Sequence, residues 1–148
     1  MSPSKFQILL IDDSEADAKL FENALKEAAP RVKLYWVATA KEGIEYLRQE
    51  NRFQDVGPVS LMVCDLNLPA MTGFEFIAQA KADQATRTIP LVVYSGSAAH
   101  EDVFRAYALG ANSYMVKAMT MDAIIQQLQV LVHYWLETVE LPDSRLLD

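Results

Sequence analysis

Apolar residues along the chain form short continuous runs, separated by stretches in which apolar positions recur at helical spacing. Five of the runs predict strands, over residues 6–13, 32–37, 59–65, 89–94 and 111–116. Apolar runs of this length, bounded by turn residues, are typical of buried parallel strands. The second run is more polar because it contains Lys33, so we expect it at an edge of the sheet.

The stretches between the runs predict helices over residues 16–29, 41–49 and 101–109, with a further helix from Thr72. A last helix begins after Thr120 and continues past Trp135. Residues with a suitable side-chain oxygen for an N-cap precede four of these helices, namely Ser14, Thr39, Thr72 and Thr120. Gly110 suits the left-handed position that ends a helix, and residues 51–58 are expected to form a polar connector.

Strands that alternate with helices through short connections predict a doubly wound α/β fold with a five-stranded parallel sheet. Right-handed crossovers with helices on both faces favour the flavodoxin-like strand order 2-1-3-4-5. We expect one domain over residues 1–148, with a core over about residues 6–132 and a C-terminal extension over 133–148. Chemistry in such folds lies beyond the carboxyl ends of the strands.

Composition narrows the classes of function. A net charge of -7 argues against direct nucleic-acid binding, because phosphate contacts depend on Lys and Arg. The single cysteine, Cys64, cannot form an internal disulfide and falls in an apolar run typical of core. No stretch approaches the length of a membrane span, and the first residues do not resemble a signal peptide. We therefore expect a cytoplasmic protein that binds neither membrane nor nucleic acid.

Polar residues follow four of the five predicted strands. Asp12 and Asp13 end the first, Asp65 the third and Ser95 the fourth, while Lys117 follows the fifth. Parallel strands bring these ends to one edge, where three carboxylates repel one another unless a cation lies among them. Carboxylates without His or Cys ligands favour Mg²⁺.

Ser95 and Lys117 are suited to holding the oxygens of a phosphoryl group attached to Asp65, which would make this carboxylate a covalent acceptor. Each residue alone also has a structural explanation. Asp65 suits a loop cap, Ser95 suits a cap for the next helix, and Lys117 suits a pair with a surface acid. Their occurrence together at four strand ends favours the functional interpretation.

With this set of residues, the chain resembles the receiver domains of two-component response regulators over about residues 6–136. The resemblance implies that Asp65 accepts a phosphoryl group from a histidine kinase. It also implies that Mg²⁺ is held by Asp12, Asp13, Asp65 and the backbone carbonyl of Asn67. Such a protein is a switch, with only modest self-phosphorylation and autodephosphorylation, and not an enzyme in the usual sense.

The same resemblance assigns the switch. It implies that Ser95 is the switch hydroxyl, Lys117 the lysine of the site and Tyr114 the switch aromatic. The chain departs from most receivers after the lysine, where Ala118 replaces a proline that is commonly joined by a cis bond. A non-proline cis bond costs about 3 to 4 kcal/mol, so we expect a trans bond or local strain there.

The C-terminal stretch 134–142 resembles the extended tail of the stand-alone response regulators that pair with phytochromes. In that subgroup the tail helps to form a homodimer, and the sensor kinase is a phytochrome. Apart from the resemblance, Val132, Trp135, Leu136 and Val139 recur at helical spacing beyond the length that covers the sheet. An apolar stripe of this kind predicts a homodimer, and the alternative is that it folds back on its own chain.

Two other functions stay open. One is a phosphorylation-independent interaction module with a vestigial acidic site, which the intact carboxylates, Ser95 and Lys117 argue against. The other is a phosphatase or flavin-binding protein, which is disfavoured because no glycine-rich loop follows Asp12 and no second carboxylate follows Asp65 closely. The small residues Ala98 and Ala99 predict a short-lived phosphoryl-aspartate, since water could reach it.

Overall fold

The computed structural model describes residues 6–142 and contains a five-stranded parallel sheet in the order β2-β1-β3-β4-β5. Its strands are β1 (Gln7–Ile11), β2 (Lys33–Val37), β3 (Leu61–Cys64), β4 (Leu91–Ser95) and β5 (Ser113–Val116). Each neighbouring pair is parallel. The predicted strand order and the edge position of β2 are confirmed.

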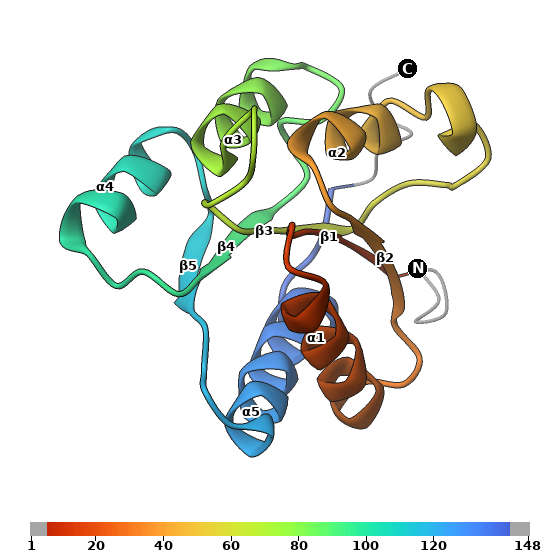
Figure 1. Cartoon of the computed structure of the whole chain (residues 1–148). Helices are drawn as coiled ribbons and strands as arrows, with labels where there is room; N and C mark the ends of the chain where they lie inside the picture. Colours follow the sequence, from red (N-terminus) through yellow and green to blue (C-terminus); the bar gives the residue numbers. More distant parts are fainter. Residues whose placement is uncertain (1–5, 143–148) are drawn as a thin grey trace.

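Helices cover both faces of this sheet, as the doubly wound prediction requires. They are α1 (Glu15–Ala28), α2 (Ala40–Leu47), α3 (Gly73–Ala82), α4 (His100–Ala108) and α5 (Met121–Val132). Figure 1 shows α1 and α5 together on one face of the sheet, with α2 and α3 on the other. Within residues 6–142, no helix is both long and apolar enough to cross a membrane.

The hydrophobic core has two halves, one on each face of the sheet, and the central strand β1 contributes to both. Ile8 and Leu10 pack under α1 and α5, whereas Leu9 and Ile11 pack under α2 and α3. Successive strand side chains point to opposite faces, so a strand covered on both sides must be apolar at every position. This explains why β1 reads as a continuous apolar run.

Capping residues mark the starts of four helices and the end of α4, at the residues that the sequence predicted. The N-cap side chains of Ser14, Thr39, Thr72 and Thr120 each accept a hydrogen bond from the backbone N–H three residues ahead. Gly110 follows α4 with φ of +114°, a conformation that glycine adopts without a steric penalty. These signals position the loops at the carboxyl ends of the strands.

The prediction that residues 51–58 form a polar connector was wrong in one respect. It contains a 3-10 turn, η2 (Asn51–Phe53), and the side chain of Phe53 is buried. The ring of Phe53 lies 5.0 Å from that of Tyr46 and 5.7 Å from that of Tyr35, measured between centroids. An aromatic cluster therefore closes the core beside the edge strand β2.

The C-terminal extension continues α5 as a π-helical segment, η3 (His133–Thr138). Val132, the last residue of α5, is buried in the half of the core on the side of α1 and α5. Trp135 and Leu136 are half-buried against the same half of the core. The predicted stripe is thus partly covered by its own chain, as the intramolecular alternative expects. The homodimer stays a prediction, and residues 143–148 of the predicted extension lie outside the described residues.

Candidate functional site

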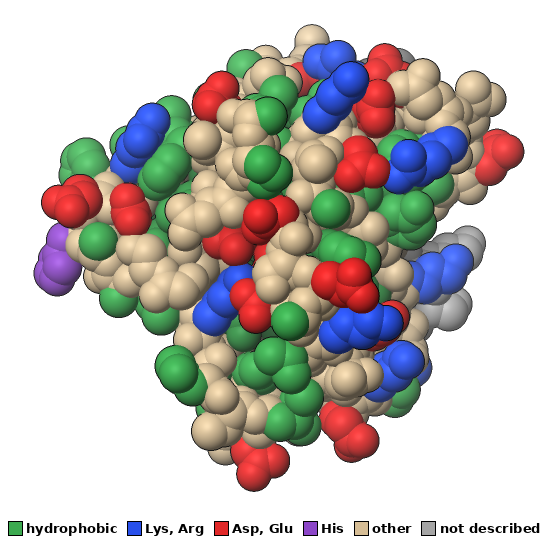
Figure 2. All heavy atoms as spheres, viewed as in Figure 1, with side chains coloured by type: hydrophobic (Ala, Val, Ile, Leu, Met, Phe, Trp, Pro, Cys, Tyr) green, Lys and Arg blue, Asp and Glu red, His purple; other side chains and the backbone are tan. Residues whose placement is uncertain are grey.

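Three carboxylates meet at the carboxyl edge of the sheet. Asp12 follows β1 and Asp65 follows β3, and these two strands are neighbours in the sheet. Asp12, Asp13 and Asp65 each offer a carboxylate oxygen, and these oxygens lie within 4.8 Å of one another. Asp12 and Asp65 are only 2% and 7% exposed, whereas Asp13 faces solvent. Figure 2 shows acidic side chains gathered near the centre of this face, next to a basic one.

Lys117 supplies the positive charge of the site. Its Nζ donates to Asp12 Oδ2 at 2.9 Å, to Asp65 Oδ2 at 3.0 Å and to Asp17 Oδ2 at 2.7 Å. The Lys117 side chain is only 15% exposed, so two of these three pairs are buried. The structural alternative for Lys117, a pair with a surface acid, accounts only for its contact with Asp17.

Asp17 is a site residue that the sequence analysis missed, because an acid in the first turn of a helix is ordinary there. Its side chain is 42% exposed and lies at the rim of the site. A signal was present in the sequence. Side chains in a helix tilt toward its N-terminus, so an acid in the first turn after Asp13 points back to the strand end.

The electrostatics of the cluster follow from burial and from this single lysine. Burial raises the pKa of Asp12 above its ordinary value, although the hydrogen bonds from Lys117 and from the Ser14 N–H oppose the rise. Burial alone would lower the pKa of Lys117, but hydrogen bonds to Asp17, Asp12 and Asp65 together raise it. One cation does not balance four carboxylates, so the site favours a further cation.

Backbone contacts fix the Asp65 carboxylate. Its Oδ1 accepts the Leu66 N–H at 2.7 Å and lies 3.5 Å from the N of Asn67, at the outer limit for a hydrogen bond. Gly73, at the start of α3, donates its N–H to the Leu66 carbonyl at 3.0 Å. A Cβ at Gly73 would lie 2.2 Å from the Asp65 carbonyl oxygen, so only glycine allows this approach. Asn67 follows in the same loop and is exposed.

Ser95 is the fully buried last residue of β4. Its backbone carbonyl accepts the Lys117 N–H at 2.8 Å, and its Oγ accepts the Ser97 N–H at 3.2 Å. Helix α4 begins after Ala99 without a side-chain cap hydrogen bond, so the alternative role for Ser95, a cap for the next helix, does not apply. The Oγ of Ser97 accepts the Ala99 N–H at 3.2 Å and donates to Asp102 Oδ2 at 2.6 Å.

Tyr114 connects β5 to the loop that follows Ser95. It lies opposite Val93 in the sheet register, and its hydroxyl donates to the Ser97 carbonyl at 2.9 Å. The ring is half-buried against the core on the side of α2 and α3. The predicted switch residues Ser95 and Tyr114 are therefore joined through a two-residue stretch of backbone.

Two further features surround the cluster. The bond between Lys117 and Ala118 is trans, as expected, since residues 6–142 contain no cis peptide bond. The indole Nε1 of Trp36, near the end of β2, donates to the Asp12 carbonyl at 2.6 Å. Sequence reasoning missed this contact because Trp36 and Asp12 meet only through the pairing of β1 with β2.

The donor set fits a hard divalent cation. The three clustered ligands are carboxylates, and Mg²⁺ and Mn²⁺ both prefer oxygen donors. Lys117 already shares two of these carboxylates, Asp12 and Asp65. A cation in this position would therefore compete with Lys117 for the same oxygens.

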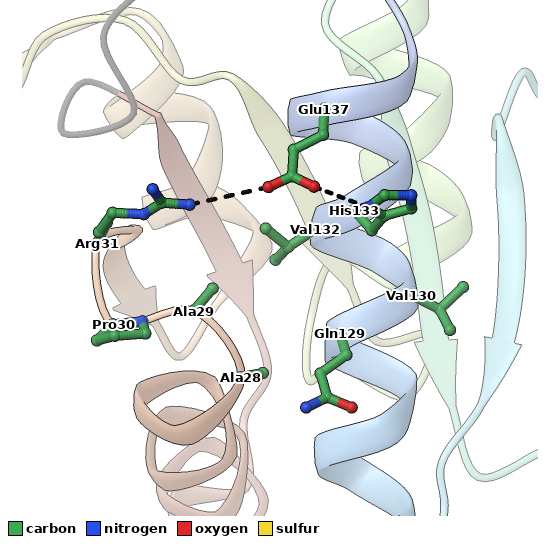
Figure 3. Close-up of a pocket in the computed structure, with 9 residues that line it drawn as sticks. All are labelled: Ala28, Ala29, Pro30, Arg31, Gln129, Val130, Val132, His133 and Glu137. Atoms are coloured by element: carbon green, nitrogen blue, oxygen red, sulfur yellow. Dashed lines mark hydrogen bonds and ion pairs between the residues drawn. The ribbon is translucent and has the colours of Figure 1, made fainter.

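A groove of about 710 Å³ lies elsewhere, between the end of α1 and the segment formed by α5 and η3. Figure 3 shows Glu137 between His133 and Arg31, with contacts of 2.7 Å and 3.8 Å respectively. Helix α1 runs back from the carboxyl edge of the sheet, so its last residues lie at the opposite edge. None of the strand-end residues lines this groove.

Comparisons with known proteins match the chain along most of its length. A family model described as response regulator receiver domain matches residues 8–129. Response regulator Rcp1 of Synechocystis sp. is 32% identical over 135 residues, which cover 91% of this chain and 92% of Rcp1.

Two solved structures give the same result. The phosphorylated cyanobacterial phytochrome response regulator RcpA aligns with a TM-score of 0.87 at 33% identity, covering 93% of this chain and 99% of RcpA. The Mn²⁺-bound form of Rcp1 aligns with a TM-score of 0.83 at 31% identity, covering 93% of this chain and 99% of that one. Both structures therefore align with this chain well beyond the sheet alone.

Proposed function

The chain belongs to the response regulator receiver domains, and on this premise we propose that it accepts a phosphoryl group from the phosphohistidine of a sensor histidine kinase onto Asp65. Receiver domains are signalling switches of two-component systems. The observation that supports Asp65 as the acceptor is its place at the end of β3. It is held there by the backbone on one oxygen and by Lys117 on the other, beside Asp12 and Asp13.

The proposed transfer is a displacement at phosphorus. A carboxylate oxygen of Asp65 forms the new P–O bond, while the P–N bond breaks and the imidazole leaves with its electron pair and takes a proton from solvent. Mg²⁺ in the site would neutralise negative charge on the carboxylates and on the transferring phosphoryl oxygens. Asp12, Asp13, Asp65 and the backbone carbonyl of Asn67 would hold it.

The remaining site residues act on the phosphoryl group and on the loops around it. Lys117 places its ammonium beside Asp65, where it can pair with a phosphoryl oxygen. Ser95 provides a hydroxyl from the end of the neighbouring strand. Movement of Ser95 would disturb the hydrogen bond from Tyr114 to Ser97, and this would shift a pre-existing equilibrium of the α4 surface. Affinity for a partner changes as a result.

The comparisons support a more specific partner. RcpA is a phytochrome response regulator, and its structure aligns with 93% of this chain. We therefore propose a phytochrome as the kinase, a homodimer as the assembly and the cytoplasm as the location. Ala98 and Ala99 follow the switch hydroxyl, and their small size supports a phosphoryl-aspartate that water removes quickly.

The test is intact mass after incubation with a small phosphodonor, with and without Mg²⁺. Wild type is expected to gain one phosphoryl group in a Mg²⁺-dependent reaction, and Asp65→Asn to gain none. Asp122→Asn is the matched control, because Asp122 lies in the first turn of α5 and outside the cluster. Labelling of Asp65→Asn at full yield would reject Asp65 as acceptor. Folded wild type that takes up no phosphoryl group would favour the phosphorylation-independent interaction module.

A further inference from the structure

The loop that carries Lys117 is held by one amide side chain, that of Gln127 in α5. The Nε2 of Gln127 donates to the Val116 carbonyl at 2.7 Å, and its Oε1 accepts the Ala118 N–H at 3.4 Å. These two backbone groups belong to the residues immediately before and after Lys117. The amide therefore holds the chain on both sides of the lysine.

The same amide oxygen also accepts the hydroxyl of Tyr94, at 2.9 Å. Tyr94 is buried and directly precedes Ser95 at the end of β4. Its ring makes an edge contact with Phe21 of α1, at 5.8 Å between centroids, so the ring itself is fixed by packing. Gln127 thus joins the end of β4, the loop after β5 and helix α5.

Both ends of the Gln127 amide are used at once. The carbonyl oxygen accepts two hydrogen bonds and the amino group donates one, which needs an acceptor and a donor on the same group. Ala118 takes part because it has a backbone N–H, which a proline lacks. The Nζ of Lys117 lies 6.0 Å from the centroid of the Tyr94 ring, so the hydrogen bonds of Gln127 are adjacent to the lysine side chain that they would orient.

We propose that Gln127 is a positioning residue for Lys117. The side-chain amide of Gln127 fixes the backbone around the lysine, so that the Lys117 Nζ reaches the oxygens at Asp65. This inference rests on the proposed role of Asp65 as phosphoacceptor. It also implies that the lysine loop and α5 move together. Gln127 would then carry a shift of Lys117 toward a phosphoryl group to α5.

The test compares Gln127→Met with Gln126→Met, a control at the adjacent, exposed position of the same helix. Methionine keeps the length of the side chain and loses every hydrogen bond. With a small phosphodonor and Mg²⁺, Gln127→Met is expected to lower the saturating labelling rate about tenfold, because small displacements of a positioned group are costly. Gln126→Met is expected to match wild type.

Mg²⁺ affinity separates positioning from general damage to the site. Lys117 is not a metal ligand but competes with Mg²⁺ for the oxygens of Asp12 and Asp65, so the affinity of Gln127→Met for Mg²⁺ is expected to equal or exceed that of wild type. Tryptophan fluorescence is the probe for this titration, because the Trp36 indole donates to the Asp12 carbonyl, whereas the second tryptophan, Trp135, lies in η3. A large loss of Mg²⁺ affinity would assign Gln127 a merely structural role and overturn the proposal.

A double-mutant cycle gives the sharpest readout. In a Lys117→Met background, Gln127→Met is expected to have no further effect on the labelling rate, since the group that it positions is gone. An equal loss in both backgrounds would overturn the proposal. Tyr94→Phe removes only one of the three hydrogen bonds, so an intermediate rate is expected, and this variant preserves the buried ring.

A measurement without phosphorylation keeps the two proposals separable. The ammonium group of Lys117 donates to three carboxylates, so we expect its hydrogens to be protected from exchange and to give a ¹H–¹⁵N signal by NMR. The signal is expected to broaden or vanish in Gln127→Met and to persist in Gln126→Met. The two proposals fail on different results. If wild type is never labelled, the phosphoacceptor function is rejected. If the Lys117 signal is unchanged in Gln127→Met, the positioning role is rejected, whatever the labelling result.

Discussion

Replacing Lys117 by methionine tests the electrostatic balance of the strand-end cluster most directly. Methionine retains much of the apolar stem of lysine and removes its charge. In the absence of metal, the variant leaves the carboxylates of Asp12 and Asp65 buried beside each other without a cation. We therefore expect Lys117→Met to be strongly destabilised in metal-free buffer and to recover when Mg²⁺ is added.

The magnitude follows from the burial of the partners. Removal of one member of a buried ion pair costs about 3 to 5 kcal/mol. The Asp17 side chain is 42% exposed, so water solvates this third carboxylate, and the raised pKa of Asp12 makes protonation of its carboxylate easier. Both effects place the loss at the lower end, about 3 kcal/mol. That loss corresponds to a fall in Tm of roughly 6 to 12 °C.

The assay is thermal and urea unfolding with EDTA or with saturating Mg²⁺, and Lys81→Met is the control. Lys81 is also half-buried, but its Nζ donates to the carbonyls of Arg87 and Ile89 and to Asn112 Oδ1, and to no carboxylate. Lys81→Met is expected to lose stability by the same amount in both buffers.

Lys117→Met is expected to regain about 2.7 kcal/mol at a Mg²⁺ concentration one hundred times the dissociation constant. Wild type should bind Mg²⁺ more weakly, because Lys117 competes for the oxygens of Asp12 and Asp65. Equal stabilisation of wild type, Lys117→Met and Lys81→Met by a fixed, subsaturating Mg²⁺ concentration would refute this reasoning.

Two other predictions concern the backbone beside Asp65 and a buried tyrosine. Gly73→Ala would place a Cβ against backbone atoms of Asp65 and Leu66, so we expect urea unfolding to show a loss of stability of about 2 to 3 kcal/mol. Gly96→Ala is the control, because a Cβ at Gly96 meets no atom within 4 Å and should change stability by less than about 0.5 kcal/mol. Equal effects of the two would contradict the close approach at Gly73. Burial, with a smaller effect of Tyr35, raises the pKa of Tyr46 from 10.0 to about 12. Its contribution to stability is therefore complete below pH 10 and lost as the pH rises toward about 12, so Tyr46→Phe should flatten the stability profile in that window.

The strand order and the four strand ends could be predicted from sequence because they depend on patterns along the chain. A strand buried on both faces must be apolar throughout, so its end is marked by the first charged residue. Asp12 and Asp65 are therefore visible as the points where apolar runs stop. Parallel pairing then brings them together without any knowledge of side-chain contacts.

The contacts that surround these residues could not be predicted in the same way. Asp17 and Lys117 are 100 positions apart, and each is ordinary in its local setting, as a helix acid and as a residue after a strand. Trp36 and Gln127 act through side-chain hydrogen bonds to backbone groups, which leave no periodic pattern. Phe53 was misjudged because a single aromatic within a polar stretch carries no periodicity.

The C-terminal segment shows how a change of helix type alters an interpretation based on spacing. A period of 3.6 residues groups Val132 with Trp135 and Val139, but η3 is π-helical, and Val139 bonds back to Tyr134, five residues earlier. The wider turn rotates the residues after Val132 relative to those before it. Val132, Trp135 and Leu136 pack in or against the same core, while Val130 and Tyr134 remain 70% and 48% exposed.

A second copy of the chain that packs on this helix would therefore meet Val130 and Tyr134 before it could reach Val132. The Tyr134 ring lies edge-on to Trp135, at 5.0 Å between centroids, and Trp135 is half-buried against the core. Contact at Tyr134 would thus press on a residue that already packs beneath α1 and α5. Self-association through this surface would therefore be coupled to the packing of α5, the helix whose Gln127 holds the loop around Lys117.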